Sequence, residues 1–271
     1  MKLGLGMHKF ARAFWTVVLG FSTLLVASCA TDMGVDKTKG TPTLDMQSRF
    51  LNPTNGGLLV GKDAMQPGDI LLSSVNSISS VGIRALSFSP VSHASIYLGN
   101  GEVAEAVTSG IRVRSVDDFI TEEASIVAFR HPGIQPANLP PMRAFIDKNV
   151  GQKYNFLGIV LQAPFILERR VCELPLVPGL VRDFCVRGVA AVQLGLGSQD
   201  KFFCSQFVLQ AFNQAGLPLT DADPRLFSPG DLLNMREGDV SSVKIKQTLQ
   251  YVGHLKMQPL PAVEAASQAR N

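Results

Sequence analysis

Short runs in which apolar and polar residues alternate occupy the middle of the chain, and this period of two predicts β-strands. The pattern gives five strands before residue 131, over residues 69–72, 92–98, 102–107, 111–115 and 125–130. Gly99-Asn100-Gly101 separates the second strand from the third and is typical of a hairpin loop. A closing strand is predicted over 250–257. Most of these strands follow one another closely, so we expect a mainly antiparallel sheet.

Three segments have the spacing of helices instead. Residues 141–150 carry apolar side chains three and four positions apart, and Gly151 follows as a stop signal. Residues 203–215 form the best-patterned helix, which Gly216 ends, with one face made of Cys204, Phe207, Val208, Ala211 and Ala215. Ser228-Pro229-Gly230-Asp231 begins a third helix. Helices and antiparallel strands together predict an α+β domain, with the sheet packed against the helix that carries Cys204.

The chain divides into segments of different composition. Residues 29–60 are rich in Thr, Gly, Asp, Asn and Pro, and predict a tether and an irregular lead-in. Residues 61–257 hold the predicted elements and form the main domain, in which the Pro-broken apolar segment 159–200 is an insertion that we expect to pack beside the functional site. Residues 258–271 are a C-terminal tail. A hydrophobic content of 46% suits one globular core.

The N-terminus predicts export. Lys2, Lys9 and Arg12 precede a short apolar run over residues 13–25, and the small residues Val26-Ala27-Ser28 stand just before Cys29. This layout is typical of a signal peptide over 1–28. Its end resembles a bacterial lipobox, which implies lipidation (palmitate among the acyl groups) of Cys29 and attachment to the membrane. Ordinary secretion and an uncleaved anchor are the alternatives. Because Ala30 rather than Asp follows, we expect an outer-membrane lipoprotein facing the periplasm.

Charge and motifs exclude several classes of function. The formal net charge is +3, and removal of residues 1–28 brings it to about zero, with no basic stripe for a nucleic-acid partner. No phosphate-binding glycine loop is present. His93, His131 and His254 are far apart and no Cys-x-x-Cys occurs, so we predict no metal and no cofactor. The oligomeric state stays open.

The cysteines can be assigned by compartment. With Cys29 assigned to the lipid, three cysteines remain in an oxidising compartment, and an odd number indicates one free thiol. Cys172 and Cys185 are close in sequence and are the predicted disulfide. Cys204 is then the free thiol, at the first turn of a helix, where backbone N–H groups lower a thiol pKa and can hold an oxyanion. The alternative is a cysteine that only fills the core.

His93 is the candidate base. Its neighbours Ala94, Ile96 and Leu98 are apolar and face the core, so His93 lies on the opposite face. A surface histidine on a half-exposed sheet is the alternative.

The hairpin register decides whether Glu105 can orient His93. A two-residue turn at Asn100-Gly101 pairs Gly99 with Glu102 and puts Glu105 on the wrong face. A three-residue loop pairs Leu98 with Glu102 and Ser95 with Glu105, which makes Glu105 a diagonal neighbour of His93. The second register also places Ala104 and Ala106 on the core face, so we prefer it. A solvated carboxylate paired with an arginine is the alternative for Glu105.

Several segments together resemble a known family. The sequence FCSQFV at 203–208 is similar to the nucleophile helix of NlpC/P60-type papain-like amidases, and GQKYNFLG at 151–158 to their Gly-x-x-Tyr segment. Here the histidine precedes the cysteine, as in the circularly permuted branch of the YaeF/YiiX type. The resemblance is shared by PGDIL, SHASIYLG, VAEA, SPGDL and QYVGHL along residues 60–256. It implies a permuted papain-like fold, catalytic roles for Cys204, His93 and Glu105, and substrate or oxyanion roles for Tyr154 and Ser205.

These residues predict a cysteine hydrolase. His93 takes the proton of Cys204, the thiolate attacks a carbonyl, and water later hydrolyses the thioester. The favoured substrate bond is a peptide or aminoacyl amide, in a small molecule, a peptide or cell-wall material. The alternatives are a lipid acyl hydrolase or acyltransferase with the same triad, and a non-catalytic envelope scaffold.

Overall fold

The structure is a computed structural model of the whole chain. It describes residues 29–35, 39–48, 50–51, 57–76, 80–81, 84, 89–153, 169–194 and 203–257. The expected signal peptide, the expected C-terminal tail beyond residue 257 and Tyr154 lie outside these ranges. None of the described helices is long and apolar enough to cross a bilayer.

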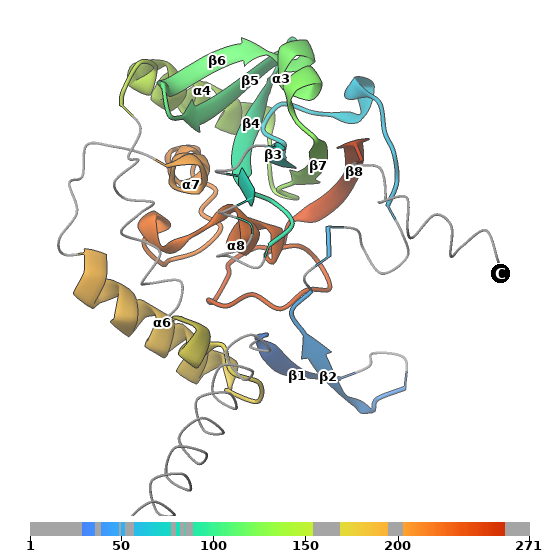
Figure 1. Cartoon of the computed structure of the whole chain (residues 1–271), viewed down its shortest axis with the longest axis vertical. Helices are drawn as coiled ribbons and strands as arrows, with labels where there is room; N and C mark the ends of the chain where they lie inside the picture. Colours follow the sequence, from blue (N-terminus) through green and yellow to red (C-terminus); the bar gives the residue numbers. More distant parts are fainter. Residues whose placement is uncertain are drawn as a thin grey trace, which may run out of the picture.

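A six-stranded antiparallel sheet forms the centre of the molecule (Figure 1). Its order is β6-β5-β4-β3-β7-β8, and the strands are β3 (Ile70–Ser74), β4 (His93–Gly99), β5 (Glu102–Val107), β6 (Gly110–Ser115), β7 (Ser125–Arg130) and β8 (Gln250–Lys256). Each alternating segment of the sequence therefore forms a strand, shifted by at most two residues from its expected bounds. The mixed fold with a large antiparallel sheet agrees with the predicted class.

Helices cover the two faces of the sheet. On one face α7 (Cys204–Gln214) packs against β4 and β5, and α4 (Leu139–Asn149) packs against α7. Ile70, Ile96 and Phe207 are fully buried in the core between them. On the other face α3 (Val116–Glu122) seals a smaller core around Leu71 and Phe119. The alternation of side chains along each strand supplies both cores.

Short helices connect these elements. They are η1 (Lys62–Ala64), η2 (Pro136–Asn138), η3 (Pro224–Leu226) and α8 (Pro229–Leu233). Ser228 caps α8 through a reciprocal bond with Asp231, as its Ser-Pro-Gly-Asp sequence suggests.

Asp69 of the Pro-Gly-Asp turn has a structural role. Its carboxylate accepts two hydrogen bonds of 2.7 Å from the guanidinium of Arg130, which ties the start of β3 to the end of β7.

The lead-in differs from the irregular tether expected over 29–60. Residues 31–35 and 42–46 form a separate two-stranded sheet, β1 (Thr31–Val35) and β2 (Pro42–Met46). Hydrogen bonds hold it to the domain: Gln47 donates to the Val240 carbonyl (2.9 Å), and the Ser48 N–H donates to Asp239 (2.8 Å). Composition alone did not reveal the hairpin because its strands are short and carry turn-forming residues.

The described part of the expected insertion contains α6 (Gly179–Leu194). Cys172 and Cys185, the predicted pair, are joined in a disulfide with a Cα–Cα distance of 5.6 Å. Arg169 ties this segment to α8 through a buried ion pair with Asp231, and it also pairs with Glu173.

Candidate active site

The turn between β4 and β5 sets the register that brings the site together. Asn100 and Gly101 both have positive φ, 52° and 75°, as the two-residue hairpin turn requires, and Gly99 pairs with Glu102. An irregularity between Tyr97 and Gly99 then shifts the pairing, so that Ser95 still lies opposite Glu105. The expected three-residue loop and its Leu98–Glu102 pair are therefore wrong, but a bulge at Leu98 restores the expected register beyond it.

This register places Glu105 beside His93. The Oε2 atom of Glu105 lies 2.8 Å from the Nε2 atom of His93, and the Glu105 side chain is 1% exposed. With Nε2 held by the carboxylate, Nδ1 is the ring nitrogen left for Cys204. A buried carboxylate in this position fixes the tautomer of the ring and stabilises its charged form.

Cys204 is the first residue of α7 and is buried. His93 and the backbone N–H groups of Ala94 and Ser205 lie close enough to its thiol to lower the thiol pKa against the effect of burial. The N–H groups of the first helical turn have no acceptor inside the helix, so they favour a negative charge there. β4 and α7 thus bring together a cysteine and a histidine that are far apart in the sequence.

The charges of the site favour an ion pair between Cys204 and His93. Burial by itself would raise the pKa of the Cys204 thiol, but the hydrogen bond and charge of His93, with the two N–H groups, lower it. Burial would likewise lower the pKa of His93, but hydrogen bonds to Cys204 and Glu105 and their charges raise it to about 10. The thiolate and imidazolium forms therefore stabilise each other.

Two arginines on β6 complete the surroundings of Glu105. Arg112 is its cross-strand partner and donates from Nε to Glu105 Oε1 at 2.8 Å. Arg114 Nε lies 2.7 Å from the same oxygen without hydrogen-bond alignment, and its guanidinium sits 5.2 Å from the Phe119 ring centroid. Burial disfavours the charged Glu105, but the bond and charge of His93, the charge of Arg114 and the bond from Arg112 lower its pKa to about 2.

Sequence reasoning missed Arg112, Arg114 and Glu123. The two arginines alternate along β6 on the Glu105 side, so extending the register by one strand would have found them. Glu123 is buried at the end of α3 near this cluster, where burial raises its pKa and the positive charge of His93 opposes the rise. It had no sequence signal, because its position depends on how α3 packs on the sheet.

Ser205, the other expected site residue on α7, does not direct its side chain toward Cys204. The Ser205 hydroxyl is buried and donates to the carbonyl of Phe227, so Ser205 acts on the Cys204 thiol through its backbone N–H, which helps to lower the thiol pKa. His131 stacks on Phe212 and His254 bonds Tyr251, and burial lowers the pKa of both histidines. Among the described histidines only His93 lies in the cluster formed with Cys204 and Glu105.

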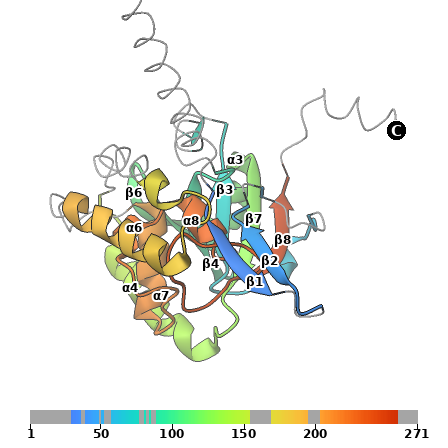
Figure 2. The same ribbon diagram turned by 90° about the horizontal axis from the view of Figure 1, so that it is seen from below.

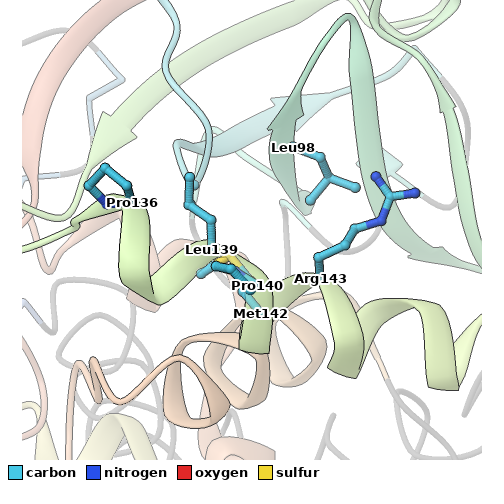
Figure 3. Close-up of a pocket in the computed structure, with 7 residues that line it drawn as sticks. Leu98, Pro136, Leu139, Pro140, Met142 and Arg143 are labelled. Carbon is cyan, nitrogen blue, oxygen red and sulfur yellow. The ribbon is translucent and has the colours of Figure 1, made fainter.

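Two hollows lie outside the cluster. One, of about 240 Å³, lies between α4 and β4 and is lined by Gly68, Leu98, Pro136, Leu139, Pro140, Met142 and Arg143 (Figure 3). The other, of about 720 Å³, is polar and includes Gln206 and Gln210 of α7. Neither is lined by Cys204, His93 or Glu105. Within the described ranges, no three His, Cys, Asp or Glu side chains are grouped as metal ligands.

Comparison with known proteins gives the family. A protein named as a probable lipoprotein peptidase, YaeF of Escherichia coli (strain K12), is 42% identical to this chain over 195 residues, which is 71% of each chain. This chain belongs to the YaeF family. No family model matches it. The crystal structure of the metalloprotein YiiX from Escherichia coli O157:H7 covers 58% of this chain and 69% of its own, with 18% identity and a TM-score of 0.39. Membership of the YaeF family supports a peptidase-like lipoprotein.

Proposed function

We propose that this YaeF-family protein is a lipid-anchored cysteine hydrolase that cleaves an amide bond with Cys204, His93 and Glu105. The observation that carries the proposal is the buried chain of contacts from the Cys204 thiol through the His93 ring to the Glu105 carboxylate. A thiol that only filled the core would not need an imidazole partner whose pKa is raised to about 10.

The chemistry follows from these groups. The Cys204 thiolate attacks the carbonyl carbon, and N–H groups at the start of α7 hold the oxyanion. His93, already protonated, gives its proton to the leaving nitrogen as the C–N bond breaks, and a thioester remains. His93 then takes a proton from water, the hydroxide attacks the thioester, and the acid leaves as Cys204 regains its charge. Glu105 orients the ring in both steps.

The histidine preceding the cysteine in the chain is the reason to assign the circularly permuted papain-like fold as part of this proposal. The Val-Ala-Ser-Cys motif is the reason to place the acyl groups on Cys29, and Ala30, in place of Asp, is the reason to place the protein at the outer membrane facing the periplasm. A peptide, aminoacyl or cell-wall amide is the substrate class. An intact triad argues against a purely structural envelope protein.

The test is hydrolysis of a panel of peptide and cell-wall amides, with phospholipid in parallel. We expect amide cleavage by the native chain, loss of it in Cys204→Ala, and a covalent acyl adduct on Cys204 when the reaction is quenched with acid. Release of fatty acid from phospholipid without any amide cleavage would instead assign acyl chemistry to the same triad. Absence of both activities, with no adduct, would contradict an enzymatic function.

A further inference from the structure

The β1–β2 hairpin exposes an apolar face. Its pairing sets Met33 opposite Leu44 and Thr31 opposite Met46, so these side chains share one face with Val35. Met33 and Val35 are 77% and 63% exposed, and Leu44 and Met46 are 51% and 59% exposed. A two-stranded sheet needs something to cover its apolar face, and the described part of the chain does not supply it.

Helix α6 also presents apolar side chains outward. Leu180, Val181 and Phe184 are 81%, 56% and 81% exposed and lie on one stripe of the helix. The opposite stripe contains Arg182, which is 2% exposed, and Val186, which is fully buried. Leu180 and Phe184 are thus exposed while Arg182 is buried, which is the reverse of the usual preference of these residue types. This arrangement is typical of a helix that lies against lipid.

Arg182 fixes the hairpin and the helix to each other. Its Nη1 atom donates to the Thr31 carbonyl at 2.8 Å, and its Nη2 atom bonds the Asp32 carboxylate (3.1 Å) and the Ser241 carbonyl (3.0 Å). A second link runs from the Leu176 N–H to the Thr31 hydroxyl at 2.8 Å. Figures 1 and 2 show α6 and β1–β2 together at one end of the molecule. The apolar face of the hairpin and the apolar stripe of α6 therefore lie at the same end of the molecule.

This end begins at the expected lipidation site. Ala30, the residue after Cys29, is fully buried, and its carbonyl accepts a hydrogen bond of 2.8 Å from the Gln47 N–H. One residue spans at most about 3.6 Å, so acyl chains on Cys29 would hold the domain directly on the bilayer. The surface closest to Cys29 would then have to lie against lipid.

We propose that this end is a membrane-docking surface for a phospholipid bilayer, with its apolar contacts made by Met33, Val35, Leu44, Met46, Leu180 and Phe184. The inference rests on the lipid anchor in the proposed function, and it adds that the domain lies flat on the membrane in one orientation. The catalytic cluster on the central sheet would then be held at a constant height above the headgroups. Substrates attached to or near that membrane would be favoured.

A single tryptophan can test this contact. The only tryptophan, Trp15, precedes Cys29, so the processed chain has none. We would introduce Phe184→Trp, with Val150→Trp as the matched control because Val150 is 48% exposed at the end of α4. In vesicles of phosphatidylethanolamine and phosphatidylglycerol with brominated acyl chains, we expect at least about twofold quenching at position 184 and little at position 150. Equal quenching of the two variants by the brominated lipid, with the protein bound to the vesicles, would overturn the proposal.

A charge-insertion pair separates docking from anchoring. The chain starting at residue 29 and carrying Cys29→Ser should still sediment with these vesicles, and Leu180→Asp with Phe184→Asp should weaken its binding about tenfold or more. Val150→Asp is the control and should bind as well as the parent.

Three other results are decisive. If mass spectrometry of the native processed chain showed no acyl groups on Cys29, the lipid anchor of the proposed function would be refuted. The Cys29→Ser chain would still measure docking in that case. Equal binding by the double variant would refute docking. A dimer in solution that the double variant dissociates, without vesicle binding, would also refute it, and would assign the surface to a second copy of this chain.

Discussion

The cluster of Cys204, His93 and Glu105 and the end of the molecule formed by β1–β2 and α6 differ in which side chains they bury. Around Glu105 the charged side chains meet opposite charges, which lower the pKa of Glu105 and raise the pKa of His93 against the effect of burial. At the other end Arg182 is also buried, but Leu180 and Phe184 of α6 and the apolar face of β1–β2 are exposed. Buried charge therefore serves two purposes in this protein: it shifts the pKa values of His93 and Glu105 in the cluster, and it holds β1–β2 and α6 together at the other end.

The largest effect should come from the sulfur itself. Cys204→Ala removes the nucleophile, and we expect amide hydrolysis to fall by at least about a thousandfold, because the remaining binding groups cannot form a thioester. The change is small and buried, so the thermal unfolding midpoint controls for folding. A variant that keeps most of its activity would remove Cys204 from the mechanism.

Next in size is the buried pair that joins the disulfide segment to α8. Arg169→Ala leaves Asp231 and Glu173 charged in the interior, and we expect the free energy of unfolding to fall by about 3–5 kcal/mol. The matched control is Arg143→Ala, which breaks a half-exposed pair with Glu102 and should cost about 0–1 kcal/mol. Urea unfolding monitored by circular dichroism measures both. Similar losses of unfolding free energy in the two variants would mean that burial of an ion pair does not determine how much it contributes to stability.

Glu105→Gln tests the tuning of His93. It keeps the shape of the side chain and removes its charge, so the pKa of His93 should fall from about 10, and activity should decrease by about 10- to 100-fold. Because His93 must carry its proton, activity is lost as pH rises through that pKa. The alkaline limb of kcat/KM should therefore move to lower pH in the variant. An unchanged limb with reduced activity would indicate a structural role only.

The smallest effect should come from the outer arginine. Arg112 is 44% exposed on its side chain and Arg114 is 11% exposed. Arg112→Gln should therefore reduce activity by only about two- to fivefold, since solvent screens its charge. Arg114→Gln is the comparison and should cost more, because it also loses its position over Phe119. The reverse order would show that the cross-strand hydrogen bond to Glu105 matters more than burial.

The acid stability of the protein gives another measure of the cluster. The pKa of Glu105 is lowered from 4.5 to about 2, so its contribution to stability is complete above pH 4.5 and is lost as pH falls toward 2. Glu105→Gln should flatten the dependence of the unfolding free energy on pH across this window. If the unfolding free energy of the variant depended on pH as that of the native protein does, groups other than Glu105 would cause the acid sensitivity.

The sequence predicted the sheet and the cluster because both depend on alternation. Once Ile96 and Ala104 are taken as core residues, His93 and Glu105 must share the other face. The same reasoning failed at the turn, where Asn100-Gly101 formed the two-residue turn and the bulge at Leu98 compensated, a combination that alternation does not specify. It also failed at β1–β2 and α6, because an exposed apolar face is invisible to an argument that assigns apolar residues to the core.

The most direct test of the account is the rate at which iodoacetamide alkylates Cys204 in the processed chain as a function of pH, with the modified peptide identified by mass spectrometry. We predict rapid alkylation of Cys204 below pH 7, because its thiolate is stabilised by His93. In His93→Ala we predict a slow reaction at that pH, because burial raises the thiol pKa and the charge of His93 no longer opposes the rise. His131→Ala, which leaves the cluster intact, should alkylate as the native protein does. Alkylation of Cys204 only above pH 8, unchanged by His93→Ala, would contradict the proposed nucleophile.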